Sequence, residues 1–331
     1  MNTFGIVGAT GAVGVEALQV LEKRNLPLKK LRLFSSARSA GKIMKYKGED
    51  VVVEELKEDS FAGVDMAIFS AGGDVSRKFA TIAAAAGCIV IDNSSAFRMD
   101  PTVPLVIPEI NADALKGHKN IVANPNCTTI VALMALYPLH KAFGVKRVFA
   151  SSYQAVSGTG AQAVMELERE VGQVVRGESV TIEVYPKQIA FNVLPHVDVF
   201  LENGYTKEEM KMENEGKKIM SHPSFKASVT CVRVPVYRAH AVAVSAEFEK
   251  PITPDAARAV LSKALGIKVV DDPSKNVYPT PLEVSGKDDC EVGRIRIDCA
   301  FDNGLSFWVV GDQLLKGAAL NAIQIAERLL A

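Results

Sequence analysis

Cys127 is the residue whose placement most directly suggests covalent chemistry. It follows Asn124-Pro-Asn126, between a strand expected at 121–123 and an apolar helix expected to begin near Thr128. The positive end of a helix dipole lowers the pKa of a cysteine placed there and raises its thiolate fraction. A cytosolic cysteine is more often a small buried hydrophobe. Placement alone therefore leaves both interpretations open.

A glycine-rich turn near the N-terminus suggests a dinucleotide site. Gly8-Ala-Thr-Gly11-Ala-Val-Gly14 follows the first expected strand and opens the first expected helix. Glycines permit a tight turn and a close approach of the backbone to a pyrophosphate, and the helix N-terminus offers free N–H groups. The spacing GxxGxxG is a variant of the usual fingerprint, so its position after a strand favours dinucleotide binding over a packing turn.

Together, a thiolate and a nicotinamide cofactor indicate one reaction type. The cysteine attacks an aldehyde, the adduct gives up a hydride, and a second nucleophile opens the resulting thioester. Such a reaction needs a base and an anion site in addition to the cysteine.

The cofactor preference follows from the second expected strand, which ends at Phe34. An NAD site usually has an acidic residue there, about 20 residues past the glycines, but no Asp or Glu occurs from Lys23 to Gly48. The stretch contains nine basic residues: Lys23, Arg24, Lys29, Lys30, Arg32, Arg38, Lys42, Lys45 and Lys47. Arg38 can bind a 2′-phosphate through two hydrogen bonds, with serine hydroxyls beside it. The sequence thus predicts NADP rather than NAD, against the alternative of a basic surface loop.

The first part of the chain alternates strand-like and helical segments. Strands are expected at 3–7, 31–34, 64–70, 89–92 and 120–123, and helices at 12–23 and 75–86. Continuous apolar strands between helices are typical of a parallel sheet covered on both faces. This part predicts a Rossmann-like, doubly wound α/β domain.

The second part has longer strand-like segments, at 146–156, 228–237, 239–250, 294–301 and 305–310, and helices at 160–175, 206–220 and 254–265. Partial alternation, as in Arg294-Ile-Arg-Ile-Asp, favours a mixed or antiparallel sheet with one face solvated or packed on a partner. We expect an NADP-binding domain at 1–127 and an α+β catalytic and dimerisation domain at 128–312. A C-terminal helix within 313–331 is expected to pack back on the first domain.

Composition excludes several classes of protein. The 331 residues include 38 Lys+Arg and 38 Asp+Glu, so the chain has no net charge to attract nucleic acid or a membrane surface. We find no membrane span, no signal peptide and no CxxC pair for a metal site. The other four cysteines, at 88, 231, 290 and 299, lie in apolar strand-like runs or, for Cys290, in a polar loop. We expect a cytoplasmic protein without metal.

Several segments, in order along nearly the whole chain, resemble the aspartate-semialdehyde dehydrogenase family. They are Gly8–Gly14, Ser35–Gly41, Asn93–Arg98, Asn126–Thr128, Gln154–Gly158, Arg233–His240 and Gly311–Gln313. The resemblance implies the reversible conversion of L-aspartyl 4-phosphate and NADPH to L-aspartate 4-semialdehyde, phosphate and NADP. That reaction feeds lysine synthesis, through diaminopimelate, and methionine and threonine synthesis. It also implies a homodimer or larger assembly.

The resemblance assigns roles to individual residues. Cys127 would be the nucleophile that forms the thioester, His240 the acid/base, and Gln154 the residue that orients the substrate. Arg233 would bind the substrate α-carboxylate and Glu215 its α-amino group. Phosphate would be bound by Arg98, Asn126 and Lys218. The cofactor would be contacted by Thr10, Gly11, Ala12, Val13, Ser35, Arg38, Ser39, Ser157, Gly158 and Gln313.

The residues themselves support these roles unequally. His240 follows Arg238, and a nearby arginine would lower its pKa and leave it neutral near pH 7; without the family it reads as a strand-end histidine. Arg233 lies in an apolar strand, where its charge needs a carboxylate partner, from the protein or from a ligand. Glu215 and Lys218 alone read as a solvated pair on a polar helix, and Glu213 is an alternative to Glu215.

Two other functions compete with this interpretation. N-acetyl-glutamyl-phosphate reductase shares the architecture and the cysteine chemistry, but the Ser-Ser-Ala-Arg segment and the Arg233…His240 pair favour the aspartyl enzyme. A catalytically silent dinucleotide sensor on the same fold would not need Cys127, Gln154, Arg233 and His240 together.

Overall fold

The computed structural model describes residues 3–330 of the chain, which divides into two compact units. One unit comprises Met1–Asn126 and Gly317–Ala331, and the other comprises Cys127–Lys316. The chain therefore leaves the first unit at Asn126 and returns to it with its last helix.

A seven-stranded sheet forms the centre of the first unit, in the order β3-β4-β2-β1-β5-β6-β7. Its strands are β1 Thr3–Val7, β2 Lys30–Ser35, β3 Ile43–Tyr46, β4 Glu49–Glu55, β5 Met66–Phe69, β6 Ile89–Asp92 and β7 Ile121–Ala123. All neighbours are parallel except β3, which runs antiparallel to β4. Because the order runs outward from β1 in both directions, right-handed crossovers place helices on both faces. The doubly wound α/β fold predicted from the sequence is confirmed.

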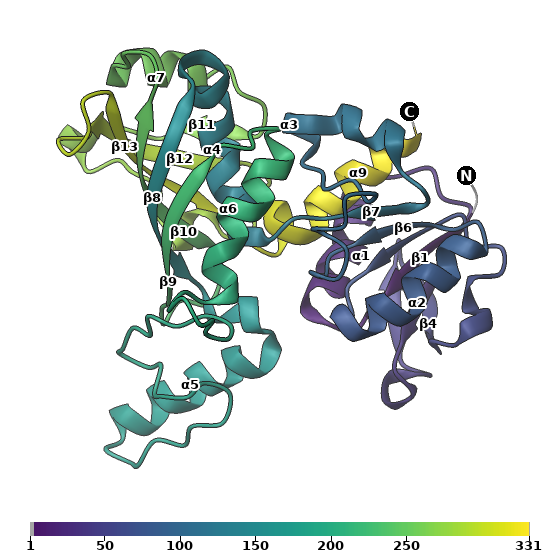
Figure 1. The fold of residues 1–331 in the computed structure, drawn as a ribbon. Helices are drawn as coiled ribbons and strands as arrows, with labels where there is room; N and C mark the ends of the chain where they lie inside the picture. Colours follow the sequence, from purple (N-terminus) through teal and green to yellow (C-terminus); the bar gives the residue numbers. More distant parts are fainter. Residues whose placement is uncertain (1–2, 331) are drawn as a thin grey trace. The chain divides into compact units, whose positions relative to one another are not determined.

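The helices of this unit include one from the C-terminus. They are α1 Ala12–Arg24, α2 Gly73–Ala85, α3 Pro108–Asn111 and α9 Leu320–Leu330. Arg24 of α1 donates two hydrogen bonds of 2.6 Å to Glu327 of α9. Asn321 donates to the carbonyl of Val106 and to Oδ1 of Asn124, at 2.9 and 2.7 Å. The last helix, yellow in Figure 1, thus lies on α1 and ties together loops of this unit.

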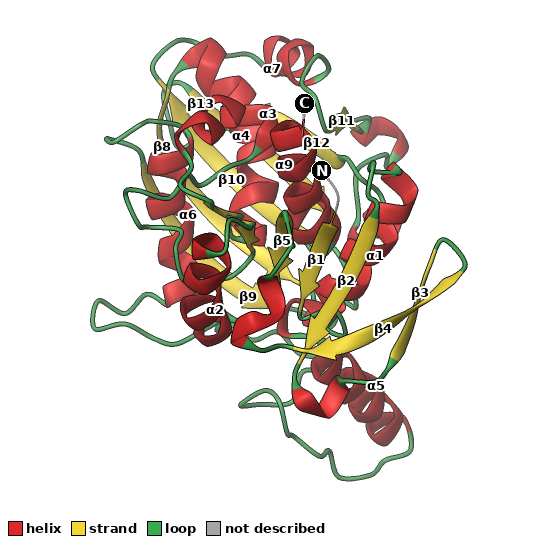
Figure 2. Cartoon of the chain, turned by 90° about the vertical axis from the view of Figure 1, so that its right-hand side faces the viewer, coloured by secondary structure: helices red, strands yellow, loops and turns green. Residues whose placement is uncertain are grey.

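The β3–β4 hairpin was not predicted from the sequence. Figure 2 shows it extending from the edge of the sheet beyond β2. Lys47 and Gly48 form its turn with φ of 51° and 82°, a backbone that supports a tight hairpin. The strands carry many charges, and Lys45 pairs with Asp50 across them. This polarity hid the hairpin, because strand prediction relies on apolar residues.

The second unit is built on a six-stranded mixed sheet in the order β11-β12-β13-β10-β8-β9. Its strands are β8 Val145–Gln154, β9 Lys226–Arg233, β10 His240–Phe248, β11 Ile267–Val269, β12 Cys290–Ile297 and β13 Gly304–Gly311. The β8–β9 and β11–β12 pairs are parallel, and the other pairs are antiparallel. The α+β second domain expected from the sequence is therefore present, with β11 as an unpredicted edge strand.

Two details of this sheet correct the sequence analysis. The strand predicted at 294–301 is β12, which begins four residues earlier, because a register shift and a positive φ of 56° at Arg294 interrupt its pattern. Cys290, assigned to a polar loop, is the fully buried first residue of β12. The polar residues Lys287, Asp288 and Asp289 before it hid the start of the strand.

Helices cover one face of the mixed sheet, whereas the short helix Pro281–Val284 covers only the part of the other face that carries Ala241 and Val310. The helices of this unit are α4 Cys127–Phe143, α5 Ala161–Val175, α6 Lys207–Ile219, α7 Pro254–Leu261 and α8 Pro281–Val284. The apolar α4 packs on β8, β10, β12 and β13, and α6 packs on β9. Phe149, Ser151, Tyr153, Ala243 and Trp308 alternate with buried residues and define what we call the open face. Figure 1 shows α5 beyond the end of the sheet, next to β9.

The helices in the described part of the chain do not have the properties of membrane spans. Within residues 3–330, none combines the length and the apolar character that a membrane span requires.

Candidate active site

Three of the predicted residues meet at one end of the mixed sheet. Gln154 is the last residue of β8, Arg233 is the last of the parallel strand β9, and the two are paired in register. His240 begins the antiparallel strand β10, and since Ala241 pairs with Tyr153, His240 lies beside Gln154. All three side chains are buried, with exposed fractions of 2%, 5% and 0%. Strand order alone therefore brings together residues up to 86 positions apart in the sequence.

Cys127 approaches the same end of the sheet through α4, which begins at this residue. Val131, one helical turn later, lies close to Gly311. A Cβ added to Gly311 would be 2.7 Å from Cγ2 of Val131. Gly311 in turn pairs with His240 across β10 and β13. Cys127 also influences Cys231 on β9, whose pKa is raised mainly by burial, then by Glu208 and to a smaller extent by Cys127. The first turn of α4 thus lies at the cluster.

The ring of His240 is held in one tautomer. The backbone N–H of Ala155 donates a hydrogen bond of 3.1 Å to Nδ1, so the proton of the neutral ring is on Nε2. Nε2 is buried and has no hydrogen-bond partner among residues 3–330. Burial, followed by the positive charge of Arg233, lowers the pKa of His240 to about 3. The ring is therefore neutral at pH 7 and presents one buried N–H.

The low pKa of His240 was predicted, but the arginine was wrongly identified. Arg238, its neighbour in sequence, donates from Nε to Asp312 at 2.6 Å and is engaged with that buried carboxylate. Arg233 acts instead, because the end of β9 lies next to the start of β10 only in the folded sheet.

Arg233 is fixed by a backbone carbonyl rather than by an acid. Its Nη1 donates to the carbonyl of Ala155 at 2.6 Å, and its Nε is buried without a partner in the described part of the chain. No side-chain carboxylate of residues 3–330 pairs with it. A buried guanidinium without an anion is costly. This arrangement suits a carboxylate that arrives with a ligand.

The turn that follows β8 joins further predicted residues to the cluster. A Cβ on Gly158 would lie 3.0 Å from Nη1 of Arg233 and 3.1 Å from Cε1 of His240, so a side chain there would press on both residues. Gln313 donates from Nε2 to Oγ of Ser157 at 2.6 Å and accepts at Oε1 from the N–H of Ala239 at 2.7 Å. Ser157, Gly158 and Gln313 thus form one group beside His240.

Ala239 is held in an uncommon backbone conformation directly before His240. Its φ is 69°, a value that L residues with a side chain rarely adopt. The hydrogen bond from its N–H to Gln313 holds this conformation and directs the chain into β10.

Gln154, for which the sequence gave no signal, belongs to a polar chain. Its Nε2 donates to Oε1 of Glu208 at 3.1 Å, and its Oε1 accepts from Oγ of Ser152 at 3.2 Å. Glu208 also pairs with Lys211 at 2.7 Å. Sequence reasoning missed Glu208, because an acid in the first turn of a helix is usually explained by the helix dipole. Its contact with Gln154 is visible only in the folded structure.

Helix α6 distinguishes the two candidate glutamates. Glu213 is engaged with Lys217 at 2.5 Å and with the backbone N–H of Ala227 at 3.1 Å. Glu215 lies on the buried face of α6 with 2% exposure, so it is not a solvated residue as the isolated pattern suggested. Lys218 is half-buried in the last turn of the same helix. The geometry therefore favours Glu215 for a role inside the unit.

In the first unit, the glycine turn has the shape of a phosphate loop. Gly8 has a φ of 82°, and a Cβ there would lie 2.4 Å from the carbonyl oxygen of Ser70. A Cβ on Gly14 would lie 2.2 Å from the carbonyl oxygen of Gly8. Gly11, which precedes α1, is exposed and meets nothing closer than 3.3 Å. Two glycines thus permit the tight turn, and the third leaves the N-terminus of α1 at Ala12 and Val13 open to an anion.

The loop after β2 lies against this turn. Oγ1 of Thr10 is 3.0 Å from Oγ of Ser35 and 3.4 Å from Oγ of Ser39. Arg38 lies in the short helix Ala37–Ser39, is exposed, and forms no ion pair with residues 3–330. Of the other basic residues near it in sequence, Arg32 is paired with Glu54 and Lys45 with Asp50. Arg38 therefore remains available to an external anion.

Strand β4 also brings acids that the sequence analysis had not placed beside this loop. Glu54 and Glu55 lie opposite Phe34 and Ser35 in register. Both are compensated, Glu54 by Arg32 at 2.6 Å and Glu55 by Lys57 at 3.2 Å.

Arg98 and Asn126 are buried in the first unit. Arg98 donates from Nε to the carbonyl of Asn124 at 2.9 Å and from Nη2 to the carbonyl of Asn93 at 2.8 Å. Its guanidinium is thus fixed against the backbone three residues before Cys127. Asn126 is the last residue of this unit.

The remaining cysteines differ from Cys127 in exposure. Cys88, Cys231 and Cys290 are buried, Cys127 is partly exposed, and Cys299 is exposed. Burial raises the pKa of Cys88 to about 12, and the pKa of Cys231 is also raised. No group of three His, Cys, Asp or Glu residues within positions 3–330 has the geometry of a metal site.

Comparison with known families identifies both parts of the chain. Residues 3–118 match the family described as semialdehyde dehydrogenase, NAD binding domain. Residues 136–316 match the family described as semialdehyde dehydrogenase, dimerisation domain.

Curated relatives and solved structures agree with these matches. Aspartate-semialdehyde dehydrogenase of Aquifex aeolicus is 51% identical over 98% of this chain and 97% of its own length. The Bacillus subtilis protein of the same name is 48% identical over 98% and 96%. Aspartate semialdehyde dehydrogenase II of Vibrio cholerae, complexed with ASA, superposes with a TM-score of 0.97 at 44% identity, covering 99% and 98%. The Candida albicans enzyme with NADP has a TM-score of 0.77 at 25% identity, covering 99% and 98%.

The neutral buried state of His240 predicts a pH dependence of stability. The unfolded chain binds a proton near the ordinary pKa of 6.5, whereas the folded chain binds it only near 3. The free energy of unfolding should therefore fall as pH decreases between these values, by up to about 1.4 kcal/mol per pH unit from this residue. His240→Asn keeps an acceptor for Ala155 and removes the titrating ring, so its slope between pH 6 and 4 should be smaller by that amount. Urea unfolding at several pH values measures it, and equal slopes would contradict the assignment.

Proposed function

The chain belongs to the aspartate-semialdehyde dehydrogenase family, and we propose that it converts L-aspartyl 4-phosphate to L-aspartate 4-semialdehyde and phosphate, reversibly and with NADP. Family membership supports an oxidoreductase of amino-acid biosynthesis that acts on aspartate semialdehyde. Within that activity, we assign the product to lysine, methionine and threonine synthesis. The meeting of Cys127, Gln154, Arg233 and His240 at one end of the mixed sheet is the observation that carries the proposal.

Cys127 is the nucleophile in this proposal. In the oxidative direction its thiolate adds to the aldehyde carbon, a C–S bond forms, and the carbonyl oxygen gains the electron pair. Bound NADP would supply the hydride acceptor, and loss of a hydride from the same carbon re-forms the C–O double bond as a thioester. A phosphate oxygen then attacks the thioester carbon and the thiolate leaves. The N-terminus of α4 stabilises the thiolate in both steps.

His240 stabilises the oxygen on which charge develops. The resemblance gives it an acid/base role, and its contacts define which atom is used. Nδ1 is occupied by the N–H of Ala155, so only Nε2 can face a substrate. The neutral Nε2–H donates a hydrogen bond to the carbonyl oxygen as the thiolate adds and while the hydride leaves. Gln154, held by Glu208 and Ser152, orients the same reacting group.

The charged ends of the substrate have separate partners. Arg233 binds the α-carboxylate with the guanidinium that has no protein acid, and Glu215 binds the α-amino group. Arg98, Asn126 and Lys218 bind phosphate. Because Arg98 is already fixed by two carbonyls, little entropy is lost when it binds the anion.

The role of Cys127 as nucleophile is tested by substituting the residue and by alkylating it. Purified protein should reduce NADP with aspartate semialdehyde only when phosphate is present, and Cys127→Ser should lose several orders of magnitude of turnover, because an alkoxide is far less available than a thiolate. Iodoacetamide should inactivate in parallel with modification of Cys127. Since Cys299 is exposed, the experiment uses a Cys299→Ser background, which should retain full activity.

Two results would contradict this mechanism. One is near-normal turnover in Cys127→Ser. The other is phosphate-dependent reduction that is faster with N-acetyl-glutamate semialdehyde, which would favour the reductase related to this family.

NADP is the proposed cofactor because Arg38 offers an unpaired guanidinium beside Thr10, Ser35 and Ser39. The cofactor contacts are Thr10, Gly11, Ala12, Val13, Ser35, Arg38, Ser39, Ser157, Gly158 and Gln313. An exposed arginine at this position matches a 2′-phosphate, and the nearby acids Glu54 and Glu55 are neutralised by basic partners. The NADP named for the Candida albicans structure supports the same choice.

Removing Arg38 should discriminate between the two nucleotides. Arg38→Ala should lose a charge-assisted contact of about 1.5–3 kcal/mol, or roughly ten- to a hundredfold in kcat/KM for NADP, and little for NAD. Lys42→Ala, at another exposed basic residue of the same stretch, serves as the matched control and should leave both unchanged. Equal losses with both nucleotides, or a wild-type preference for NAD, would refute the assignment.

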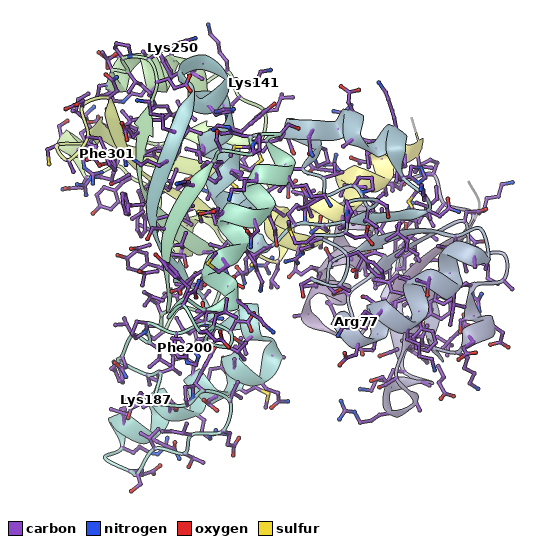
Figure 3. All side chains as sticks on the ribbon, in the orientation of Figure 1. Arg77, Lys141, Lys187, Phe200, Lys250 and Phe301 are labelled. Atoms are coloured by element: carbon purple, nitrogen blue, oxygen red, sulfur yellow. The ribbon has the colours of Figure 1, made fainter. Side chains whose placement is uncertain are left out.

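We further propose a homodimer formed through the open face of the mixed sheet. This face belongs to the region that matches a dimerisation domain. Phe149, 52% exposed, stacks on Phe301, which Figure 3 labels, and Tyr153 packs on Trp308. Next to them lies a pocket of about 310 Å³ lined by Ala243, Tyr278, Pro279 and Trp308, among others. Such a continuous aromatic surface is typical of an interface.

A charge at the centre of this face should disrupt the dimer. Phe149→Glu should raise the dimer dissociation constant by about a hundredfold or more, because a carboxylate would be buried without a partner. Sedimentation velocity over a concentration series measures the shift. Leu265→Glu, at an exposed apolar residue in the turn after α7, is the control and should remain dimeric. A wild type that sediments as a monomer at all concentrations would overturn the proposal.

A further inference from the structure

Tyr185 contacts the cluster from a segment to which neither the sequence nor the family resemblance gave a role. It lies in the loop between α5 and α6. Its hydroxyl, which carries one proton, lies 3.1 Å from Oγ1 of Thr159 and 3.4 Å from the carbonyl oxygen of Val156, both in the turn after β8. The guanidinium carbon of Arg233 lies over its ring, 5.9 Å from the ring centre. One side chain thus contacts both Arg233 and the turn that holds His240.

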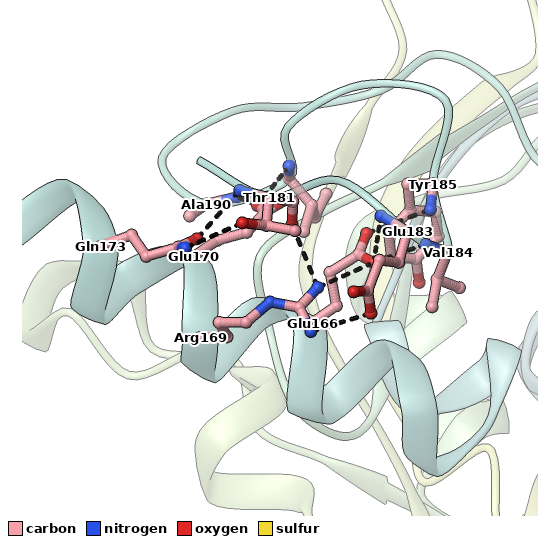
Figure 4. Close-up of polar contacts among 10 residues, drawn as sticks. Glu166, Arg169, Glu170, Gln173, Thr181, Glu183, Val184, Tyr185 and Ala190 are labelled. Carbon is pink, nitrogen blue, oxygen red and sulfur yellow. Dashed lines mark hydrogen bonds and ion pairs between the residues drawn. The ribbon is translucent and has the colours of Figure 1, made fainter. Parts of the chain in front are cut away.

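The loop that carries Tyr185 is fastened to α5 by buried carboxylates, as Figure 4 shows. Glu166, 1% exposed, accepts from the backbone N–H groups of Glu183, Val184 and Tyr185 at 2.9, 2.5 and 3.1 Å. Four residues later on the same face of α5, Glu170 accepts from the N–H groups of Ile189 and Ala190, both at 2.8 Å. The backbone N–H groups of the loop therefore bind carboxylate oxygens, where those of a strand would bind the carbonyl oxygens of a neighbouring strand.

The outer part of the loop is fastened in the same manner. Arg169 donates to Glu183 at 2.9 Å and to the carbonyl of Thr181 at 3.0 Å, and Gln173 exchanges hydrogen bonds with Thr181 at 3.0 Å. Beneath it, Ile189 and Ala190 pack with Leu167 and Val156 in one apolar cluster, on which Tyr185 also packs. A segment without regular structure is thereby held as firmly as a strand.

Such an anchored tyrosine matters because Arg233 has few other restraints. An arginine side chain has four rotatable bonds, and here a single hydrogen bond to the carbonyl of Ala155 fixes one end of the fork. A flat aromatic ring beside the guanidinium restricts the rotation that remains, and a cation–π contact stabilises that orientation. The positive charge is thus held in place without an acid that would compete with a ligand carboxylate.

We propose that Tyr185 is a positioning residue that aims the guanidinium of Arg233 at the substrate carboxylate, and that Glu166 and Glu170 of α5 hold Tyr185 for this purpose. This inference rests on the proposed function, in which Arg233 binds the α-carboxylate. It predicts that Tyr185 sets the affinity for the amino-acid end of the substrate. The affinity for phosphate, which uses other residues, does not depend on it.

The test is a comparison of Michaelis constants in three variants of the full-length enzyme. Tyr185→Leu removes the ring and should raise the KM for aspartate semialdehyde roughly 3- to 30-fold. Its KM for phosphate and its kcat should change by less than about twofold. Tyr185→Phe keeps the ring and should stay within about threefold of the wild type for the aldehyde. Tyr205→Leu is the matched control, because Tyr205 is also half-buried and hydrogen-bonds through its hydroxyl, to Ser228 at 2.9 Å.

Glu166→Gln provides a second route to the same result if Tyr185→Leu does not fold. An amide offers one oxygen and places an NH₂ group against the three N–H donors, so the loop should loosen while the ring stays on the chain. The aldehyde KM should rise in the same direction as in Tyr185→Leu, by a smaller factor, with the phosphate KM unchanged. The double variant Tyr185→Leu/Arg233→Leu should be no weaker for the aldehyde than Arg233→Leu alone, because Tyr185 acts through Arg233.

The outcomes separate this inference from the proposed function. If Tyr185→Leu and Glu166→Gln raise both Michaelis constants alike, or lower only the melting temperature, the positioning role is wrong. If the wild type turns over the substrate but Arg233→Leu leaves its KM unchanged, the carboxylate assignment of the proposed function is wrong instead. A rise confined to the aldehyde in Tyr185→Leu, Glu166→Gln and Arg233→Leu, without additivity, supports both.

Discussion

The polar groups of one small residue, Ala155, organise the candidate active site. Its N–H binds Nδ1 of His240 and its carbonyl accepts from Arg233, so two side chains from different strands are fixed by the first residue after β8. The first contact leaves the proton of the imidazole on Nε2. Burial, and then the positive charge that the second contact keeps close by, lower the pKa of His240 and keep the ring neutral. Backbone groups can do this reliably, because strand pairing determines their positions and they carry no net charge of their own.

Several buried or partly buried carboxylates of this fold accept hydrogen bonds from backbone N–H groups. Strand β9 is an edge of the mixed sheet, and its outward N–H groups at Ala227 and Cys231 bind Glu213 and Glu209 of α6. The loop after α5 is held by Glu166 and Glu170 in the same way. Charge-assisted bonds of this kind offset much of the desolvation cost and occupy N–H groups of β9 that could otherwise pair with another strand. They also orient the helix α6, whose buried face carries Glu208 and Glu215.

The pattern of apolar residues along the sequence was sufficient to predict those strands that are short apolar runs. The bounds of β1 and β6 were predicted to the residue, since each is a short apolar run between turn residues. The β3–β4 hairpin was missed because its strands are charged, and β12 was displaced because a bulge interrupts its alternation. At the site, residue type and family resemblance led to Cys127 and His240. Glu208 and Tyr185 could not be found, because their roles come from contacts with residues 54 and 48 positions away in the sequence.

The return of α9 to the first unit has a consequence for how this chain can fold during its synthesis. Asn321 completes the hydrogen bonding of Val106 and Asn124, and Glu327 pairs with Arg24, yet the ribosome makes α9 only after the whole second unit. At about 5–20 residues per second, the nascent first unit waits roughly 10–40 s between the emergence of Asn126 and that of Gly317. A sheet that forms in this interval lacks one of its covering helices, and the apolar surface that Ile323 and Ala326 later cover is open to water. Transiently exposed apolar surface of this kind makes a nascent chain prone to aggregation.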